Sequence, residues 1–204
     1  MHYLDHSYLT CKKFKLDLNR NTEFDQIHSF IDSSKKYHWH ASHRMLLHTI
    51  DYGQFLTKRK FGELVSGIPT NEILIAHIED DFTNYKPRLI DWIKKVDVSK
   101  LEDKIEHLIS HFDRLPNKYR DFILKPFNMT KENVSMLIPC SLFGAEHYSD
   151  SEIERAEYIN TLDDYGLIFD IKEVLECIKF DEQWMNNPDK EKIKWIKSLL
   201  QMKK

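Results

Sequence analysis

Histidine is the residue type with the most chemical potential in this sequence. The 204 residues include eleven histidines, and five of them lie between positions 36 and 77: His38, His40, His43, His48 and His77. Neutral imidazole is a common ligand of zinc and iron in proteins. The group therefore indicates a metal site, provided that the fold brings several of its members together.

The segment NEILIAHIEDDF supplies carboxylates next to one of these histidines. Its apolar residues recur at helical spacing, which predicts a helix over Asn71–Phe82. On that helix His77, Asp80 and Asp81 share one face at spacings of three and four residues, so an imidazole and a carboxylate could reach a common point. Glu79 projects away from this face and has the weaker case for a role there.

Most of the other histidines lie in a segment that predicts a second helix, over Trp39–Phe61. Apolar residues collect on one face around His43, which is therefore expected to point inward. His48 falls about 140° away from His43 around such a helix, too far for both to bind one ion easily. If this helix packs antiparallel to the next one, His40 and His43 would meet the next helix's histidine and aspartates.

The two helices together predict a metal-dependent hydrolase. The ligand candidates are His40, His43, His77 and Asp81. A mixed set of imidazole and carboxylate ligands suits zinc, iron or manganese. An open coordination position would activate a water molecule for hydrolysis, and Asp80 or Glu79 could act as the base.

An alternative interpretation of the same residues is structural. Buried histidines and aspartates often satisfy one another by hydrogen bonds between helices, without any metal. The chain would then be a non-catalytic binding or regulatory protein that contacts a protein partner or a second copy of itself. Nucleic acid is not an expected partner, because 30 basic against 33 acidic side chains give a formal charge of −3.

The elements that must position these residues are predicted to be mainly α. Only five glycines occur, and most segments repeat their apolar residues at helical spacing. We expect an irregular helical bundle with at most one short β element near the N-terminus, at Cys11–Leu18, where apolar and polar residues alternate. The bundle forms either a single domain over residues 1–204 or two lobes, a histidine-rich one at 1–97 and a helical one at 98–204.

Hydroxyl side chains mark where several helices should begin. A serine or threonine oxygen can accept a hydrogen bond from an unpaired amide of the first helical turn. The expected starts are Thr22, Thr70, Ser99, Thr130 and Ser149 or Ser151. A histidine pair on one of these helices, His107 and His111, lies at the edge of the apolar stripe and is expected at the surface.

The cellular compartment is also constrained. No apolar run approaches the roughly 20 residues that cross a bilayer, and the first residues lack the apolar core of a signal peptide. The three cysteines are widely spaced and contain no CxxC pair, which argues against a disulfide framework and a thiolate zinc site. We therefore expect a cytoplasmic protein without membrane contact.

Three stretches between residues 40 and 92 form a pattern of their own: HASHRMLLHTIDYGQFLTKRKFG, AHIEDDF and KPRLIDWI. A His-Arg helix ending in Phe-Gly is followed by His-Ile-x-x-Asp and then by a Pro with Asp-Trp behind it. This pattern resembles a family of small, uncharacterised, mainly helical bacterial and phage proteins, and the resemblance implies no established activity. The matching positions are His43, Arg44, His48, Phe61, Gly62, His77, Ile78, Asp81, Pro87, Asp91 and Trp92.

Overall fold

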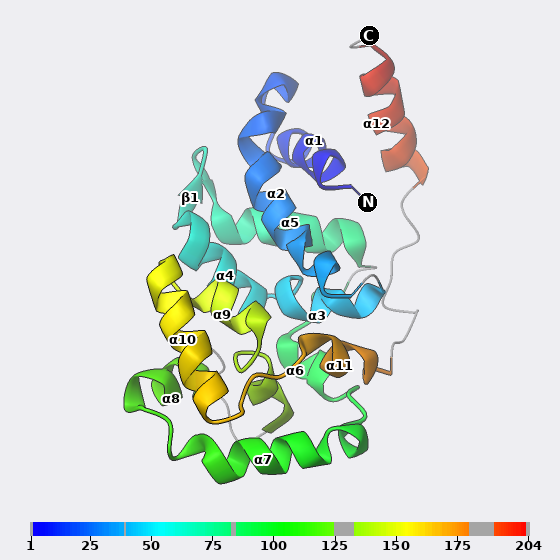
Figure 1. Ribbon diagram of the computed structural model, residues 1–204. Helices are drawn as coiled ribbons and strands as arrows, with labels where there is room; N and C mark the ends of the chain where they lie inside the picture. The colour runs from blue at the N-terminus through cyan, green and yellow to red at the C-terminus, as the bar shows by residue number, and fades with distance from the viewer. Residues whose placement is uncertain (1, 39, 83–84, 125–132, 180–189, 203–204) are drawn as a thin grey trace. The chain divides into compact units, whose positions relative to one another are not determined.

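A computed structural model describes residues 2–38, 40–82, 85–124, 133–179 and 190–202. The described chain is mainly α-helical, as predicted, with one small antiparallel sheet (Figure 1). It divides into two compact units. The first contains residues 1–36, 43–89 and 181–204, and the second contains residues 37–42 and 90–180.

The first unit contains His43, His77, Asp80 and Asp81. Its helices and strands are α1 (Tyr3–Lys13), η1 (Leu18–Phe24), α2 (Asp25–Asp32), η2 (Ser33–Lys36), α3 (Arg44–Leu47), α4 (Tyr52–Phe61), β1 (Leu64–Val65), β2 (Ile68–Pro69), α5 (Thr70–Asp81) and α12 (Lys190–Met202). Helix α1 packs against α2 and α5, and α4 also packs against α5. Fully buried apolar side chains from these helices form the core, including Ile31, Leu46, Ile73 and Ile78.

The predicted strand at Cys11–Leu18 is wrong. Helix α1 continues through Lys13, and a turn with Lys15 at φ 56° follows it. The helix is held at its start by a capping box, in which the His2 ring accepts from the Leu4 amide and Asp5 accepts from the His2 amide. The only strands of the described chain, β1 and β2, pair as a hairpin over residues 64–69.

The single helix expected over Trp39–Phe61 is broken in two. Helix α3 ends at Leu47, and α4 begins only at Tyr52. Side chains of the intervening turn cap the second helix: Thr49 Oγ1 accepts from the Gly53 amide at 2.8 Å, and Asp51 Oδ1 accepts from the Tyr52 amide at 2.7 Å. The helix predicted over Asn71–Phe82 is present as α5, from Thr70 to Asp81.

The second unit is also helical. Its elements are η4 (Val98–Lys100), α7 (Glu102–Phe112), α8 (Asn117–Leu124), η6 (Asn133–Leu137), α9 (Leu142–Tyr148), α10 (Glu152–Asp164) and α11 (Ile171–Glu176). Helix α6 (Leu89–Ile93) and η3 (Ala41–His43) fall at the boundaries between the two units. The predicted cap at Ser151 is confirmed, because its hydroxyl accepts from the Glu154 amide. The start predicted at Thr130 lies outside the described residues.

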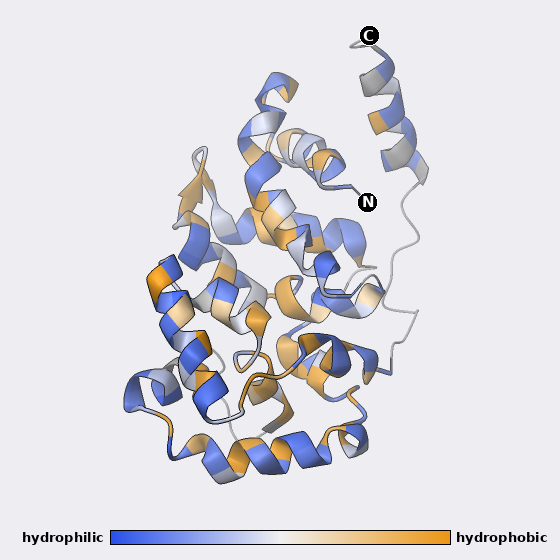
Figure 2. Ribbon diagram, viewed as in Figure 1, coloured by the Kyte–Doolittle hydropathy of each residue, from blue (hydrophilic) through white to orange (hydrophobic). Residues whose placement is uncertain are grey.

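Hydrophilic and hydrophobic residues are interspersed along the helices (Figure 2). Among the described residues, none of the helices is long and apolar enough to cross a membrane.

Candidate metal centre

Four buried side chains of the first unit converge on one point. Asp32 is the last residue of α2, His48 follows the last residue of α3, and His77 and Asp81 lie one turn apart on α5. Each offers one ligand atom, and the four atoms lie within 4.8 Å of one another. Both histidines are fully buried, and the two carboxylates are at most 8% exposed.

The spacing of these atoms matches the edges of a metal coordination shell. His48 Nε2 lies 3.1 Å from His77 Nε2, 3.3 Å from Asp81 Oδ2 and 3.5 Å from Asp32 Oδ1. His77 Nε2 lies 3.6 Å from Asp32 Oδ1 and 3.8 Å from Asp81 Oδ2. In a tetrahedron with bonds of about 2.0–2.2 Å, neighbouring ligand atoms are about 3.3–3.6 Å apart. The cluster therefore has the dimensions of a site for one ion.

A chain of hydrogen bonds fixes the orientation of His77. His77 Nδ1 lies 2.9 Å from His28 Nδ1, and His28 Nε2 lies 2.8 Å from Thr10 Oγ1. If His77 Nε2 offers its lone pair to an ion, the His77 proton sits on Nδ1 and is donated to His28. His28 then carries its proton on Nε2 and donates to the threonine. Such outer partners fix the tautomer and ring orientation of metal-ligating histidines.

Two cations balance the charge of the carboxylates. Arg44 Nε donates to Asp81 Oδ2 at 3.0 Å, and Lys35 Nζ lies 2.6 Å from Asp32 Oδ1. Burial acts to raise the pKa of Asp32, but the neighbouring imidazoles of His48 and His77 bring it below its usual value. Burial likewise opposes ionisation of Asp81, whose pKa is nevertheless held well below the usual range by His48, His77 and Arg44. Both carboxyl groups are therefore ionised at neutral pH.

Burial has the opposite effect on the imidazoles. The pKa of His77 is lowered by desolvation, and that of His28 is lowered well below its usual value by desolvation and by the neighbouring His77 and His6. These rings are neutral at pH 7. A neutral imidazole has the free lone pair that a metal ligand needs.

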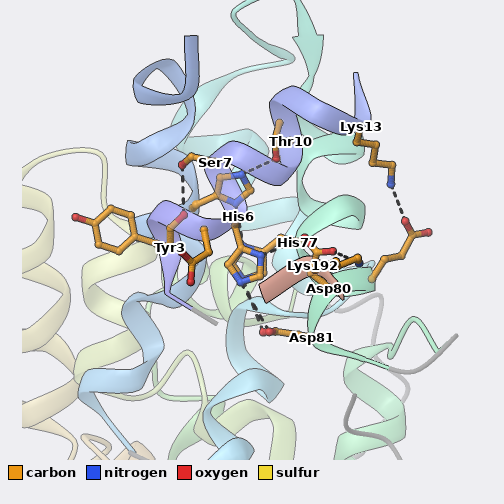
Figure 3. A network of polar contacts seen from close by, with 12 residues as sticks. Tyr3, His6, Ser7, Thr10, Lys13, His77, Asp80, Asp81 and Lys192 are labelled. Carbon is orange, nitrogen blue, oxygen red and sulfur yellow. Dashed lines mark hydrogen bonds and ion pairs between the residues drawn. The ribbon is translucent and has the colours of Figure 1, made fainter. Parts of the chain in front are cut away.

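A further histidine from α1 adjoins the cluster (Figure 3). The His6 ring stacks on the His77 ring, with centroids 3.8 Å apart and planes inclined by 20°. His6 Nδ1 lies 3.4 Å from Asp80 Oδ2, and His6 Nε2 lies 3.8 Å from Asp81 Oδ1. The other Asp80 oxygen, Oδ1, accepts from Lys192 of α12 at 2.5 Å.

The structure brings together only part of the predicted ligand set. His77 and Asp81 belong to the cluster. His43 is buried as expected, and its ring lies beside that of His48 at 5.7 Å between centroids, but it is not one of the four converging residues. His40 belongs to the second unit, where its ring lies 6.1 Å from that of His38.

The two residues predicted as bases have other partners. Glu79 is partly exposed and pairs with Lys13 and Lys86, each at 2.6 Å. Burial acts to raise the pKa of Asp80, but hydrogen bonds from His6 and Lys192 lower it below its usual value. Their catalytic roles stay predictions.

Sequence reasoning missed Asp32, His48, His28 and His6. His28 and Asp32 are four residues apart on α2, the same spacing as His77 and Asp81 on α5, so a search for paired His-x-x-x-Asp segments would have found them. His48 was set aside because it points away from His43 on a continuous helix. Since α3 ends at Leu47, the helical angle does not apply, and His48 adopts φ −97° and ψ 47°.

Comparison with known proteins gives one match. Residues 1–101 match the family model of a domain of unknown function (DUF6915). All four converging residues, and also His6 and His28, lie within this span. Neither the curated proteins nor the solved structures contain a significant match to the chain.

Proposed function

We propose that Asp32, His48, His77 and Asp81 bind a divalent transition-metal ion, and that this ion serves a hydrolytic enzyme. The observation that carries the proposal is the convergence of two imidazole nitrogens and two carboxylate oxygens from α2, α3 and α5. Each imidazole Nε2 lies 3.1–3.8 Å from the other Nε2 and from the two carboxylate oxygens.

The ligand types favour a catalytic ion over a purely structural one. Structural zinc sites are dominated by thiolates, whereas the three cysteines of this chain are buried outside the cluster. Four protein ligands would fill a tetrahedral zinc ion, but they leave one or two positions on a five- or six-coordinate ion. The set therefore favours iron or manganese, and the remaining positions would hold the water molecule that attacks the substrate.

The exposed fractions of the cluster residues suggest a side for substrate approach. His48 and His77 have no exposed surface, while Asp32 is 8% exposed and its partner Lys35 has a side chain that is 39% exposed. We propose that water and substrate reach the ion past Asp32 and Lys35. Movement of the flexible lysine would widen this route without disturbing the buried histidines.

Hydrolysis also requires a general base for the attacking water. Asp80 and Glu79 were the candidates from the sequence, and Glu79 has the weaker position because it is salt-bridged at the surface. Asp80 is oriented toward His6, so its role is better described as positioning this histidine.

The test uses untagged purified protein, because a histidine tag would itself carry metal. We expect near-stoichiometric iron or manganese by elemental analysis, strong loss of that metal in His77→Ala, and full retention in His107→Ala, a control at an exposed histidine of the second unit. Chromogenic carboxyl and phosphate esters should be hydrolysed by the metal-loaded protein, and a chelator should stop this activity reversibly.

The outcomes separate the alternatives. Metal binding without hydrolysis of any ester would favour a structural ion in a non-catalytic helical binding or regulatory protein. A wild-type chain that binds no metal, even after refolding with zinc, iron or manganese, would leave only the hydrogen-bonded network and would contradict the proposal.

A further inference from the structure

We propose that Asp81 bridges two metal ions, and that His6 Nε2 binds the second. This inference rests on the proposed function, because the first ion is the one held by Asp32, His48 and His77. It extends the site to α1 and changes its chemistry from that of a single ion to that of a dinuclear centre.

The state of His6 is the first observation. Its side chain has no exposed surface, and its Nε2 atom has no hydrogen-bond partner. Leaving a buried polar atom unpaired is costly, so native proteins retain few such atoms without a reason. Asp80 accepts from the opposite ring nitrogen, Nδ1, which leaves Nε2 as the atom with the lone pair. Metal-binding histidines commonly donate their other ring nitrogen to a carboxylate in this way.

The second observation is the geometry around Asp81. One of its oxygens, Oδ2, lies 3.8 Å from His77 Nε2, and the other, Oδ1, lies 3.8 Å from His6 Nε2. Oδ2 also lies 3.3 Å from His48 Nε2, so it faces the two imidazoles of the first site, whereas Oδ1 faces His6. A single ion with bonds of about 2.1 Å can span each of these separations. A carboxylate with its two oxygens directed in this way is suited to bridging two ions.

The stacking of the His6 and His77 rings is compatible with two neighbouring ions. Nearly parallel rings with centroids 3.8 Å apart cannot easily direct their nitrogens at the same point, but they can each hold an ion side by side. Two-metal hydrolases have ions about 3.5–4 Å apart. The ring separation, the unpaired nitrogen and the bridging carboxylate thus agree on one arrangement.

The ligand count predicts an order of binding and a substrate class. The second ion has two protein ligands, His6 and Asp81, against four for the first, so it should bind more weakly and complete its shell with water or substrate oxygens. Lys35 and Arg44 already balance the negative charges of Asp32 and Asp81, so two divalent ions would make the site positively charged. The excess positive charge would attract an anionic substrate, and a phosphate ester fits between two ions.

Manganese titration of the untagged metal-free protein tests the inference. We expect wild type to bind two Mn²⁺ ions, the second at least tenfold more weakly, with a spin-coupled electron paramagnetic resonance signal that develops with the second equivalent. His6→Phe keeps an aromatic ring against His77 and should bind one ion without the coupled signal. His107→Phe is the surface control and should behave as wild type.

A second variant guards against a folding defect in His6→Phe. Asp80→Asn removes the charge behind His6 and should weaken the second ion about 10–100-fold while leaving the first unchanged, with an unaltered circular dichroism spectrum. Wild type that saturates at one ion would overturn the inference and leave the proposed function standing. Folded His6→Phe that loses both ions would also overturn it, since His6 would then serve the first ion. Failure of wild type to bind any Mn²⁺ or other divalent ion would remove the proposed function as well.

Discussion

Lys35 competes with a metal ion for a ligand atom, so its removal should tighten metal binding. Its ammonium nitrogen lies 2.6 Å from Asp32 Oδ1, the oxygen that faces His48 and His77. A divalent ion bound to this oxygen at about 2.1 Å would lie at most about 4.7 Å from the ammonium. At that distance the repulsion is about 1.8 kcal/mol even in a medium as polar as water.

The lysine can relieve part of this repulsion by moving into solvent. Its side chain is 39% exposed, so it can swing away from the ion. The cost to metal binding is then reduced towards the free energy lost when an exposed ion pair is broken, about 0.2–1 kcal/mol. Since 1.4 kcal/mol corresponds to about a tenfold change in affinity, Lys35→Met should bind the first ion about two- to fivefold more tightly than wild type. The gain should shrink as salt is added, because salt screens exposed charges.

Competition against a chromophoric chelator measures this change. The matched control is Lys58→Met, because Lys58 forms a comparable surface pair with Glu63 at 2.7 Å and lies outside the cluster. Its affinity for metal should equal that of wild type. Weaker binding in Lys35→Met, or an equal gain in both variants, would refute the assignment of Asp32 as a ligand.

Three further outcomes follow from the same contacts. Thr10→Val removes the acceptor of the His28–His77 chain and should weaken the first ion about tenfold in a chelator titration, with normal helicity. Acid should destabilise the metal-free protein in urea unfolding. Burial lowers the pKa of His6, His28 and His77, so below about pH 6.5 the unfolded chain binds more protons, and unchanged stability from pH 8 to 5 would contradict this. Gly53→Ala should reduce both folding and metal binding, measured by circular dichroism and elemental analysis, because a Cβ there would clash with the backbone carbonyl of Leu47.

Spacing on a single helix was enough to predict part of the site. His77 and Asp81 occupy positions i and i+4 of α5, and helical geometry alone places such side chains next to each other. The helical fold was equally accessible from the apolar repeats. Both inferences depend on residues close in sequence, where the local geometry is fixed by the helix itself.

The wrong predictions concern segments where side chains near a helix end decide where the helix begins or stops. The alternation at Cys11–Leu18 was outweighed by the capping box at His2 and Asp5, which starts a helix that then runs past Cys11. The break before Tyr52 depends on hydroxyl and carboxylate oxygens of the turn, which compete with helical hydrogen bonds. Because the break redirects His48, an error of a few residues in one helix end removed a ligand from the predicted set.

Local spacing marks His28 and Asp32 as a second His-x-x-x-Asp pair, but it does not show which helices pack together. Asp32 and His6 come from α2 and α1, and nothing within either helix indicates that both face α5. Their contacts are long-range, such as the 3.4 Å approach of His6 to Asp80 across 74 positions. Sequence predicts the presence of imidazoles and carboxylates, while tertiary packing decides which of them share a point.

The charge balance of the cluster indicates that the site is built before the metal arrives. Zinc fingers are unfolded without their ion, since their ligands have few other partners. Here Arg44 and Lys35 neutralise the two buried carboxylates, and His28 and Thr10 hold His77 in place. Such a cluster can be desolvated without the full cost of an unpaired charge. Metal should therefore raise the stability of an already folded chain. Arg44 and Lys35 stabilise the carboxylates without metal, so they should also limit the affinity of the site for a metal ion.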